Sequence, residues 1–474
     1  MQTLKENIEN RIHKVYESAK ASGLVLSTFY ELALSVLAWQ ALSDTEKSEG
    51  KQGEASVPEK YTYTAVMKPD HIPVLKGRVA AILNALDKQL PQWKGLLHLD
   101  SRLIEEVPDH IWILIATTWQ NLGLAPATQY EQSSVSIAID YLEVLMSAEQ
   151  QGDPFLTPTA LAGLMTDCLN DHTGESLYDP YPRSGNLLAA MATHAAGKPR
   201  HIYARMPGRL AWKLTAIRLL LQNNLSAHMH WYNNSDLATL SKNNDQKQFD
   251  LVITNPPFGG SVAGFAIPVA TGNWNMLAQR SKRLDVAFLC HALSSLADNG
   301  QATILLPAIF LSGNGIFKEI MKQVIAQNIL EAVIELPGGL FEHTNIATVL
   351  LHFDKARTQE KKRKVFLLDA TRFIEKSGSR VLLQRERIYE LLQQAKKNHS
   401  LHEHSDKLIV TTTDAIAEKG YRLQFIYYKE GKGRIEKQAN AQQLKLECET
   451  LERQWKIAKA RLDQIISVNT IPTA

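Results

Sequence analysis

The residues best suited to chemistry are Asn255, Pro256, Pro257 and Phe258, which directly follow the apolar run 249–254. That run predicts a strand, and the two prolines end it because proline has no N–H for a sheet. The Asn255 side-chain oxygen and the Pro256 carbonyl can accept hydrogen bonds from an exocyclic amine and raise electron density on its nitrogen. The Phe258 ring offers a face for an unstacked base. A plain turn is the alternative, which the position after a strand disfavours.

Strand-like and helix-like segments that alternate from about Asp153 onward are expected to position this turn. Short apolar or β-branched runs alternate there with helix-patterned segments, which predicts a mostly parallel, doubly wound α/β sheet. Ligands bind such sheets outside the carboxyl ends of their strands, and Asn255 stands at such an end. The strand-like runs are 201–203, 250–253, 302–306 and 346–351.

Helical patterns flank this α/β region. Apolar residues recur at helical spacing from Leu4 to about Ala125, interrupted by a polar stretch from Ser43 to Lys60 that predicts a flexible loop. Near the C-terminus an apolar seam with alternating spacings of four and three predicts a helix that needs a partner, either its own domain or another chain. The seam is Leu444, Cys448, Leu451, Trp455, Ala458, Leu462 and Ile465.

We therefore expect three regions: a helical N-terminal domain over 1–150, an α/β domain over 151–375, and a coiled-coil-like helical region over 376–474 for partner contact.

Composition narrows the class of protein. A chain of 474 residues with 45% hydrophobic and 21% charged residues is typical of a globular protein of two or three domains. We find neither an apolar leader nor a run of ~18 apolar residues, so the expectation is a cytoplasmic protein without membrane contact. A net charge of +3 permits nucleic-acid binding without arguing for it. Cys168, Cys290 and Cys448 are far apart, which predicts packing roles and no metal site.

The sequence Asn-Pro-Pro-Phe is similar to the catalytic motif of amino-group DNA methyltransferases, and its form with Phe is typical of adenine-N6 enzymes. The chain resembles the modification (M) subunits of type I restriction-modification systems over about residues 150–375, and 416–423 extends the likeness. Further segments follow in the order of that family: 154–158, 285–291, 305–307, 335–341 and 365–370.

The resemblance implies a Rossmann-like methyltransferase sheet and an adenine-specific DNA methyltransferase that uses S-adenosylmethionine on double-stranded DNA. Asn255 and Pro256 are expected to orient the adenine amine, Pro257 to rigidify the turn, and Phe258 to stack the flipped base. The family also implies a specificity (S) subunit bound through the C-terminal helix, a second M subunit and a restriction subunit, as parts of an antiviral defence system.

The resemblance assigns the cofactor to five residues: Phe155, Thr157, Asp179, Gly185 and Asp236. The first two lie beneath its methionine end, and Asp236 matches the residue that reads its adenine amine. Turn capping is the alternative role for the two aspartates.

A basic loop between Phe258 and Asp285 lies where the family closes over the target base. Its residues Arg280, Lys282 and Arg283 are expected to hold DNA phosphate, with a purely solubilising role as an equal alternative.

Two positions depart from the family's cofactor motifs. Arg183 stands where a glycine that permits positive φ is expected, and Met206 where an acid accepts from the ribose hydroxyls. These changes predict weakened or lost binding of S-adenosylmethionine. They leave open an alternative function as a catalytically impaired, methyltransferase-like DNA-binding or scaffold subunit. A methyltransferase for RNA or protein glutamine fits the flanking helical regions less well.

Overall fold

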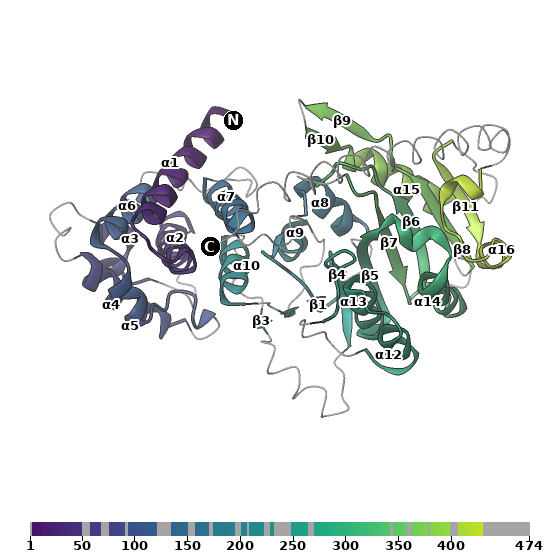
Figure 1. Cartoon of the computed structure of the whole chain (residues 1–474), viewed down its shortest axis with the longest axis horizontal. Coiled ribbons are helices and arrows are strands. Elements are labelled where there is room, and N and C mark those ends of the chain that lie inside the picture. The colour runs from purple at the N-terminus through teal and green to yellow at the C-terminus, as the bar shows by residue number, and fades with distance from the viewer. Residues whose placement is uncertain are drawn as a thin grey trace, which may run out of the picture.

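Helices gather at one end of the molecule and a large sheet at the other, with α10 between them (Figure 1). The computed structural model describes residues 2–49, 57–67, 75–90, 93–120, 134–149, 157–169, 174–194, 201–205, 208–221, 228–231, 248–263, 270–341, 345–357, 363–377, 380–398 and 406–429. The structural statements below refer to these residues.

The N-terminal part is all-helical, as predicted. Its elements are α1 (Gln2–Ala21), α2 (Leu26–Glu49), η1 (Glu59–Tyr61), α3 (Tyr63–Val66), α4 (Leu75–Asp87), α5 (Ser101–Glu106), α6 (Asp109–Gln120) and α7 (Ser134–Glu149).

The predicted loop from Ser43 to Lys60 is wrong in its first part, because α2 continues through Glu49. The Ser43 side chain is fully buried and donates a hydrogen bond to the Trp39 carbonyl, 2.8 Å away. A hydroxyl can bond back to its own helix in this way, so polar composition alone does not end a helix. Residues 50–56 lie outside the described part.

The second part is an α/β fold with nine strands in one sheet. Its helices are α8 (Thr159–Asp167), α9 (Asn186–His194), α10 (Arg209–Leu221), α12 (Gly272–Gln279), α13 (Leu284–Ser294), η5 (Ala308–Ser312), α14 (Gly315–Ala326), α15 (Arg385–Asn398), α16 (Thr413–Glu418) and η6 (Phe425–Tyr427). Its strands are β1 (Ser176–Asp179), β2 (His201–Ala204), β3 (His228–Trp231), β4 (Phe249–Thr254), β5 (Leu296–Pro307), β6 (Leu330–Glu335), β7 (Thr348–Asp354), β8 (Lys364–Asp369) and β11 (Leu408–Thr412), and a separate hairpin joins β9 (Ile374–Ser377) to β10 (Arg380–Leu383).

The strand order is β3-β2-β1-β4-β5-β7-β6-β8-β11. Strand β7 runs antiparallel to both neighbours and β11 antiparallel to β8, while the other pairs are parallel. Ile253 packs in one core with α8, α9, α10 and α15, whereas its neighbour Val252 packs in a second core with α12, α13, α14 and α16. Helices therefore cover both faces, and the predicted doubly wound, mostly parallel sheet is confirmed. Strand β11 and helix α15 join this body from beyond residue 375.

Asp250 holds the amino ends of β1 and β4 together. Its Oδ2 accepts hydrogen bonds from the Glu175 N–H (3.0 Å), the Ser176 N–H (2.9 Å) and the Ser176 hydroxyl (2.8 Å). An ionised carboxylate makes such bonds strong, so they set the pairing of Leu177 with Leu251. This Asp250 latch brings the carboxyl ends of the two strands side by side.

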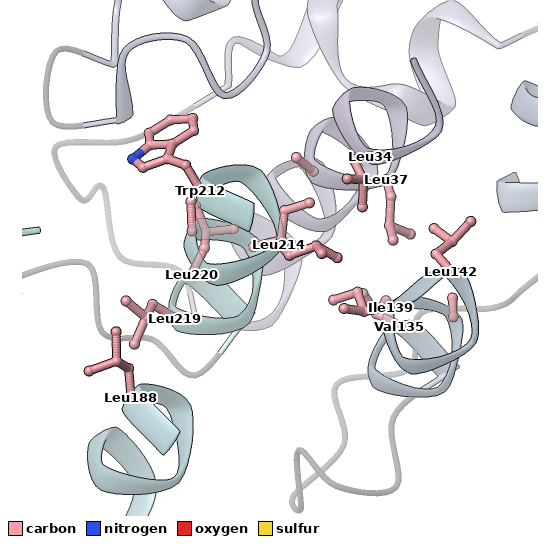
Figure 2. Close-up of a cluster of buried hydrophobic side chains, with 14 of the residues drawn as sticks. Leu34, Leu37, Val135, Ile139, Leu142, Leu188, Trp212, Leu214, Leu219 and Leu220 are labelled. Atoms are coloured by element: carbon pink, nitrogen blue, oxygen red, sulfur yellow. The ribbon is translucent and has the colours of Figure 1, made fainter. Parts of the chain in front are cut away.

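Helix α10 packs against both parts of the molecule. Figure 2 shows Leu214 of α10 directed toward Leu34 and Leu37 of α2 and Ile139 of α7, while Leu219 lies next to Leu188 of α9. One continuous buried core therefore runs from the helical part into the sheet.

Among the described helices, none is long and apolar enough to cross a membrane. Cys168 and Cys290 are buried and are in no disulfide, which agrees with packing roles; Cys448 lies outside the described residues.

Candidate active site

The strand order reverses direction between β1 and β4. From β1 the chain proceeds outward to β2 and β3, then returns to place β4 on the other side of β1. A sheet that reverses in this way opens a crevice beyond the carboxyl ends of the two strands, where its connecting loops diverge. Asp179 ends β1 and Asn255 follows β4, so both stand at this crevice.

Residues 255–258, which the sequence predicts to be catalytic and which are called the catalytic turn below, are held in a defined orientation. The Asn255 side chain is 1% exposed, and its Nδ2 donates to the Thr157 hydroxyl at 2.9 Å, which fixes the plane of the amide. Pro256 and Pro257 are buried behind it. Phe258 is half-buried, and its ring meets the Phe341 ring edge-on, with centroids 5.9 Å apart. The turn therefore presents polar acceptors and an aromatic ring with little freedom to move.

A buried acid braces the chain after Phe258. Asp285, in the first turn of α13, is fully buried, and its Oδ2 accepts from the Gly259 N–H at 2.8 Å. Arg283 donates to both oxygens of this carboxylate, with Nε–Oδ1 3.0 Å and Nη2–Oδ2 2.6 Å. Gly259 has φ of +66°, which permits this tight approach. The sequence alone predicts no role for Asp285, although an acid in an otherwise apolar helix is an indication of one.

The basic loop lies directly against this turn. The Val262 N–H donates to the Lys282 carbonyl at 2.9 Å, and the Leu284 N–H donates to the Gly260 carbonyl at 2.8 Å. Arg280 and Lys282 are exposed beside the site, whereas the Arg283 guanidinium is committed to Asp285.

Asp179 places a buried carboxylate at the end of β1. Its side chain is fully buried, its Oδ1 accepts from the Tyr181 N–H at 2.9 Å, and its Oδ2 has no hydrogen-bond partner among the described residues. Burial raises the pKa of Asp179 to about 7, although the Tyr181 N–H, the nearby Thr254 hydroxyl and the Arg183 charge counteract it. An acceptor without a partner in so dry a position suits an N–H or ammonium donor of a ligand.

Arg183 follows in residues 181–186 after β1, which the sequence predicts to receive the cofactor and which are called the cofactor turn below. Its φ is +52°, the left-handed conformation that normally favours glycine. Its Nε lies 3.4 Å from the Asn255 carbonyl, and its guanidinium carbon lies 5.4 Å from the centre of the Tyr181 ring. The side chain therefore crosses from the cofactor turn to the catalytic turn.

Gly185 has a packing role within this turn. Its φ is +81°, and a Cβ there would lie 2.6 Å from both Oγ1 and Cγ2 of Thr215 on α10. Only glycine allows so close a contact between the turn and the helix. The missing side chain thus serves the fit to α10.

Thr157 joins the two turns. Its hydroxyl accepts from Asn255, and its carbonyl accepts from the Asn186 side chain at 3.3 Å.

Of the nine catalytic and cofactor residues predicted from sequence, the structure thus brings together Asn255, Pro256, Pro257, Phe258, Thr157, Asp179 and Gly185. Phe155 and Asp236, together with Met206, lie outside the described residues.

A family model described as N-6 DNA Methylase matches residues 140–437. The chain is 29% identical over 265 residues to the type I restriction enzyme MpnII methylase subunit of Mycoplasma pneumoniae, covering 51% of this chain and 48% of that protein. It is 28% identical over 228 residues to the EcoEI methylase subunit of Escherichia coli, covering 46% and 45%. The chain thus spans about half the length of the curated relatives it matches.

Solved structures share the fold. The type I restriction-modification methyltransferase subunit from Streptococcus thermophilus has a TM-score of 0.64 at 18% identity, covering 89% of this chain and 98% of that one. A chain from a structure of type I R-M complex assembly has a TM-score of 0.60 at 16% identity, covering 97% and 99%.

Proposed function

Because the chain belongs to the N-6 DNA methylase family, we propose that it transfers a methyl group to adenine N6 in double-stranded DNA. The observation that carries the proposal is the buried Asn255 amide, fixed by Thr157 at the carboxyl end of β4, beside the buried carboxylate of Asp179. Each of these groups is in place before any ligand arrives, as transition-state stabilisation requires.

Asn255 and Pro256 act on the target amine. Their oxygens accept its two hydrogens, which orients the nitrogen lone pair and increases its nucleophilicity. The Phe258 ring stacks the extruded adenine, and its edge contact with Phe341 keeps the ring from turning away. The two prolines hold the acceptors at a fixed spacing.

S-adenosylmethionine would supply the methyl group when bound. The unpaired Oδ2 of Asp179 fits its ammonium group, and Phe155, Thr157 and Asp236 are proposed to complete the cofactor side. Arg183 is poorly suited to a cofactor-binding turn, because its guanidinium already reaches the Asn255 carbonyl. We therefore propose that the protein binds this cofactor more weakly than a chain with glycine at position 183.

The proposed function also requires contacts with DNA and with partner subunits. Arg280 and Lys282 lie exposed beside the catalytic turn, where they can meet phosphate, and Arg283 supports the same loop. A specificity subunit would bind the C-terminal region 376–474, with a second M subunit and a restriction subunit in the same complex. A cytoplasmic location belongs to this proposal.

Methyl transfer from labelled S-adenosylmethionine to DNA, with the partner subunits present, tests this function. Asn255→Ala should abolish labelling of adenine because the amine loses an acceptor, while thermal unfolding should change little because the fold loses only one hydrogen bond. Asn10→Ala, at an exposed position of α1, is the matched control and should methylate normally. Wild-type rates in the Asn255→Ala variant would mean that the catalytic turn is misassigned.

One observation favours a second candidate function. Arg183 links the cofactor turn to the catalytic turn through the protein's own atoms. A chain that no longer methylates gains stability from such a link, and it can still hold an extruded base. This alternative is a DNA-holding scaffold subunit of the same kind of complex.

A further inference from the structure

Arg218 of α10 is a buried cation that touches the cofactor turn. Its side chain is 1% exposed, and its Nε donates to the Ser184 carbonyl at 3.2 Å. The same guanidinium reaches α7, where its Nη2 lies 2.9 Å from Glu143 Oε2 and 2.7 Å from Asp140 Oδ1. One side chain therefore joins the helical N-terminal part to the turn that follows β1.

The charges make this link hard to open. The Glu143 side chain is 7% exposed; burial raises its pKa, whereas the Arg218 charge and the Ser184 hydroxyl lower it. A buried guanidinium that loses its carboxylate is left with an uncompensated charge. Ser184 cannot move away without uncovering a donor of that same guanidinium.

Close packing around Arg218 also holds the cofactor turn in one position. Gly185, next to Ser184, lies against Thr215 so closely that a Cβ would overlap it. Figure 2 shows Leu188, near the start of α9, next to Leu219. Helix α10 in turn packs against α2 and is joined to α7 by the Arg218 ion pairs, so the helical part of the molecule helps to set its position.

We propose that Arg218 is a positioning residue for the cofactor turn, through which α7 of the helical part holds Ser184 and its neighbours in the geometry that receives the cofactor. The assignment rests on the proposed function, since it takes this turn to be the cofactor site. Arg218 itself touches no reacting atom. The helical part then contributes to cofactor affinity as well as to any contact with DNA or partner chains.

The test removes the link without leaving a buried charge. In Arg218→Met, Glu143→Leu both partners become apolar, a change that often leaves stability intact. Amide hydrogen exchange over residues 181–187 should become about tenfold faster, because the turn opens locally more often. The KM for S-adenosylmethionine should rise about tenfold, while the KM for DNA stays within about twofold.

A second ion pair, which is partly buried, supplies the control. Arg385 of α15 makes a bidentate pair with Asp167 of α8, with contacts of 2.6 and 2.8 Å, and both helices lie outside residues 181–187. Arg385→Met, Asp167→Leu should leave exchange over 181–187 and the cofactor KM unchanged. If the first double variant fails to fold, Arg218→Lys decides, because it keeps the charge but cannot serve Ser184 and Glu143 together.

Unchanged exchange over 181–187 in the Arg218 variants would overturn the assignment, and so would equal acceleration in both pairs. The exchange measurement needs no bound cofactor, so it decides the matter even where the wild type binds S-adenosylmethionine too weakly for a KM. A wild type that never methylates DNA contradicts the proposed function instead and leaves the exchange result standing.

Discussion

Arg183 combines a left-handed backbone with a cation directed at the catalytic turn. Both features should oppose S-adenosylmethionine, because the backbone favours glycine and the side chain occupies the crevice. The double variant Arg183→Gly, Met206→Glu should bind the cofactor roughly 100-fold more tightly in calorimetric titration. The glycine removes the side chain and the strain, and the glutamate restores an acceptor for the ribose hydroxyls.

Arg183→Ala separates the two effects of that arginine. It removes the cation but keeps a Cβ at φ of +52°, so the part of the gain that it recovers is due to the side chain. Micromolar binding by the wild type, with no improvement in the variants, would contradict the expectation. Binding that appears only in the variants would favour the scaffold function.

Asp179 should make stability depend on pH. Its pKa is about 7 when folded, against about 3.9 for an unperturbed aspartate, so between these values the folded protein binds more protons than the unfolded chain. Stability contributed by this group therefore falls as pH rises from about 4 to about 7. Asp179→Asn mimics the neutral acid, and it should raise the free energy of unfolding by about 3–4 kcal/mol at pH 8 but hardly at pH 4. An equal effect at both pH values would point to packing as the cause.

Residues 255–258 were predictable because their residue types and their position after a strand can both be seen within a few residues of sequence. Asn255 directly follows an apolar run, so its type and its place at a strand end are visible together. Asp285 and Arg218 were not, because their partners Gly259 and Glu143 lie 26 and 75 residues away in sequence. Composition and spacing do not report which distant group a buried charge will meet.

The contact between the cofactor turn and α10 can be tested with one added methyl group. Gly185→Ala introduces a Cβ at φ of +81° that overlaps Thr215. Gly23→Ala is the matched control, since Gly23 has φ of +76° with nothing within 4 Å. We expect the control to lose about 1 kcal/mol from backbone strain alone and Gly185→Ala to lose about 2–4 kcal/mol in chemical denaturation. Equal losses would mean that the turn can shift away from α10.

Strand and helix positions followed from periodicity, but their arrangement did not. The runs 250–253 and 302–306 lie in strands of the sheet, and the run 346–351 lies in β7 from Thr348 onward. Nothing in them indicated that β7 runs antiparallel between β5 and β6, because a strand buried on both faces shows the same apolar pattern in either direction. The extension of α2 through Glu49 escaped prediction because polar residues are read as loop when their buried partners are unknown.

The predicted C-terminal seam concerns the assembly and lies outside the described residues. Its apolar face, Trp455 included, is costly to leave in water, so it should dock on a partner helix. Deleting residues 440–474 should leave the sheet domain folded by circular dichroism and abolish co-purification with a specificity subunit. A truncated chain that still forms the complex would place the contact elsewhere.

The Asp250 latch joins groups 74 residues apart in sequence. A ribosome releases the N-terminal partner first, so β1 leaves the tunnel well before the acid that anchors it. Until β4 has emerged, β1 and its Asp179 have no neighbouring strand on that side. The apolar side chains of β1 then remain exposed or pack against α10. The crevice is thus a late product of translation, and a nascent chain halted before residue 250 cannot yet bind anything there.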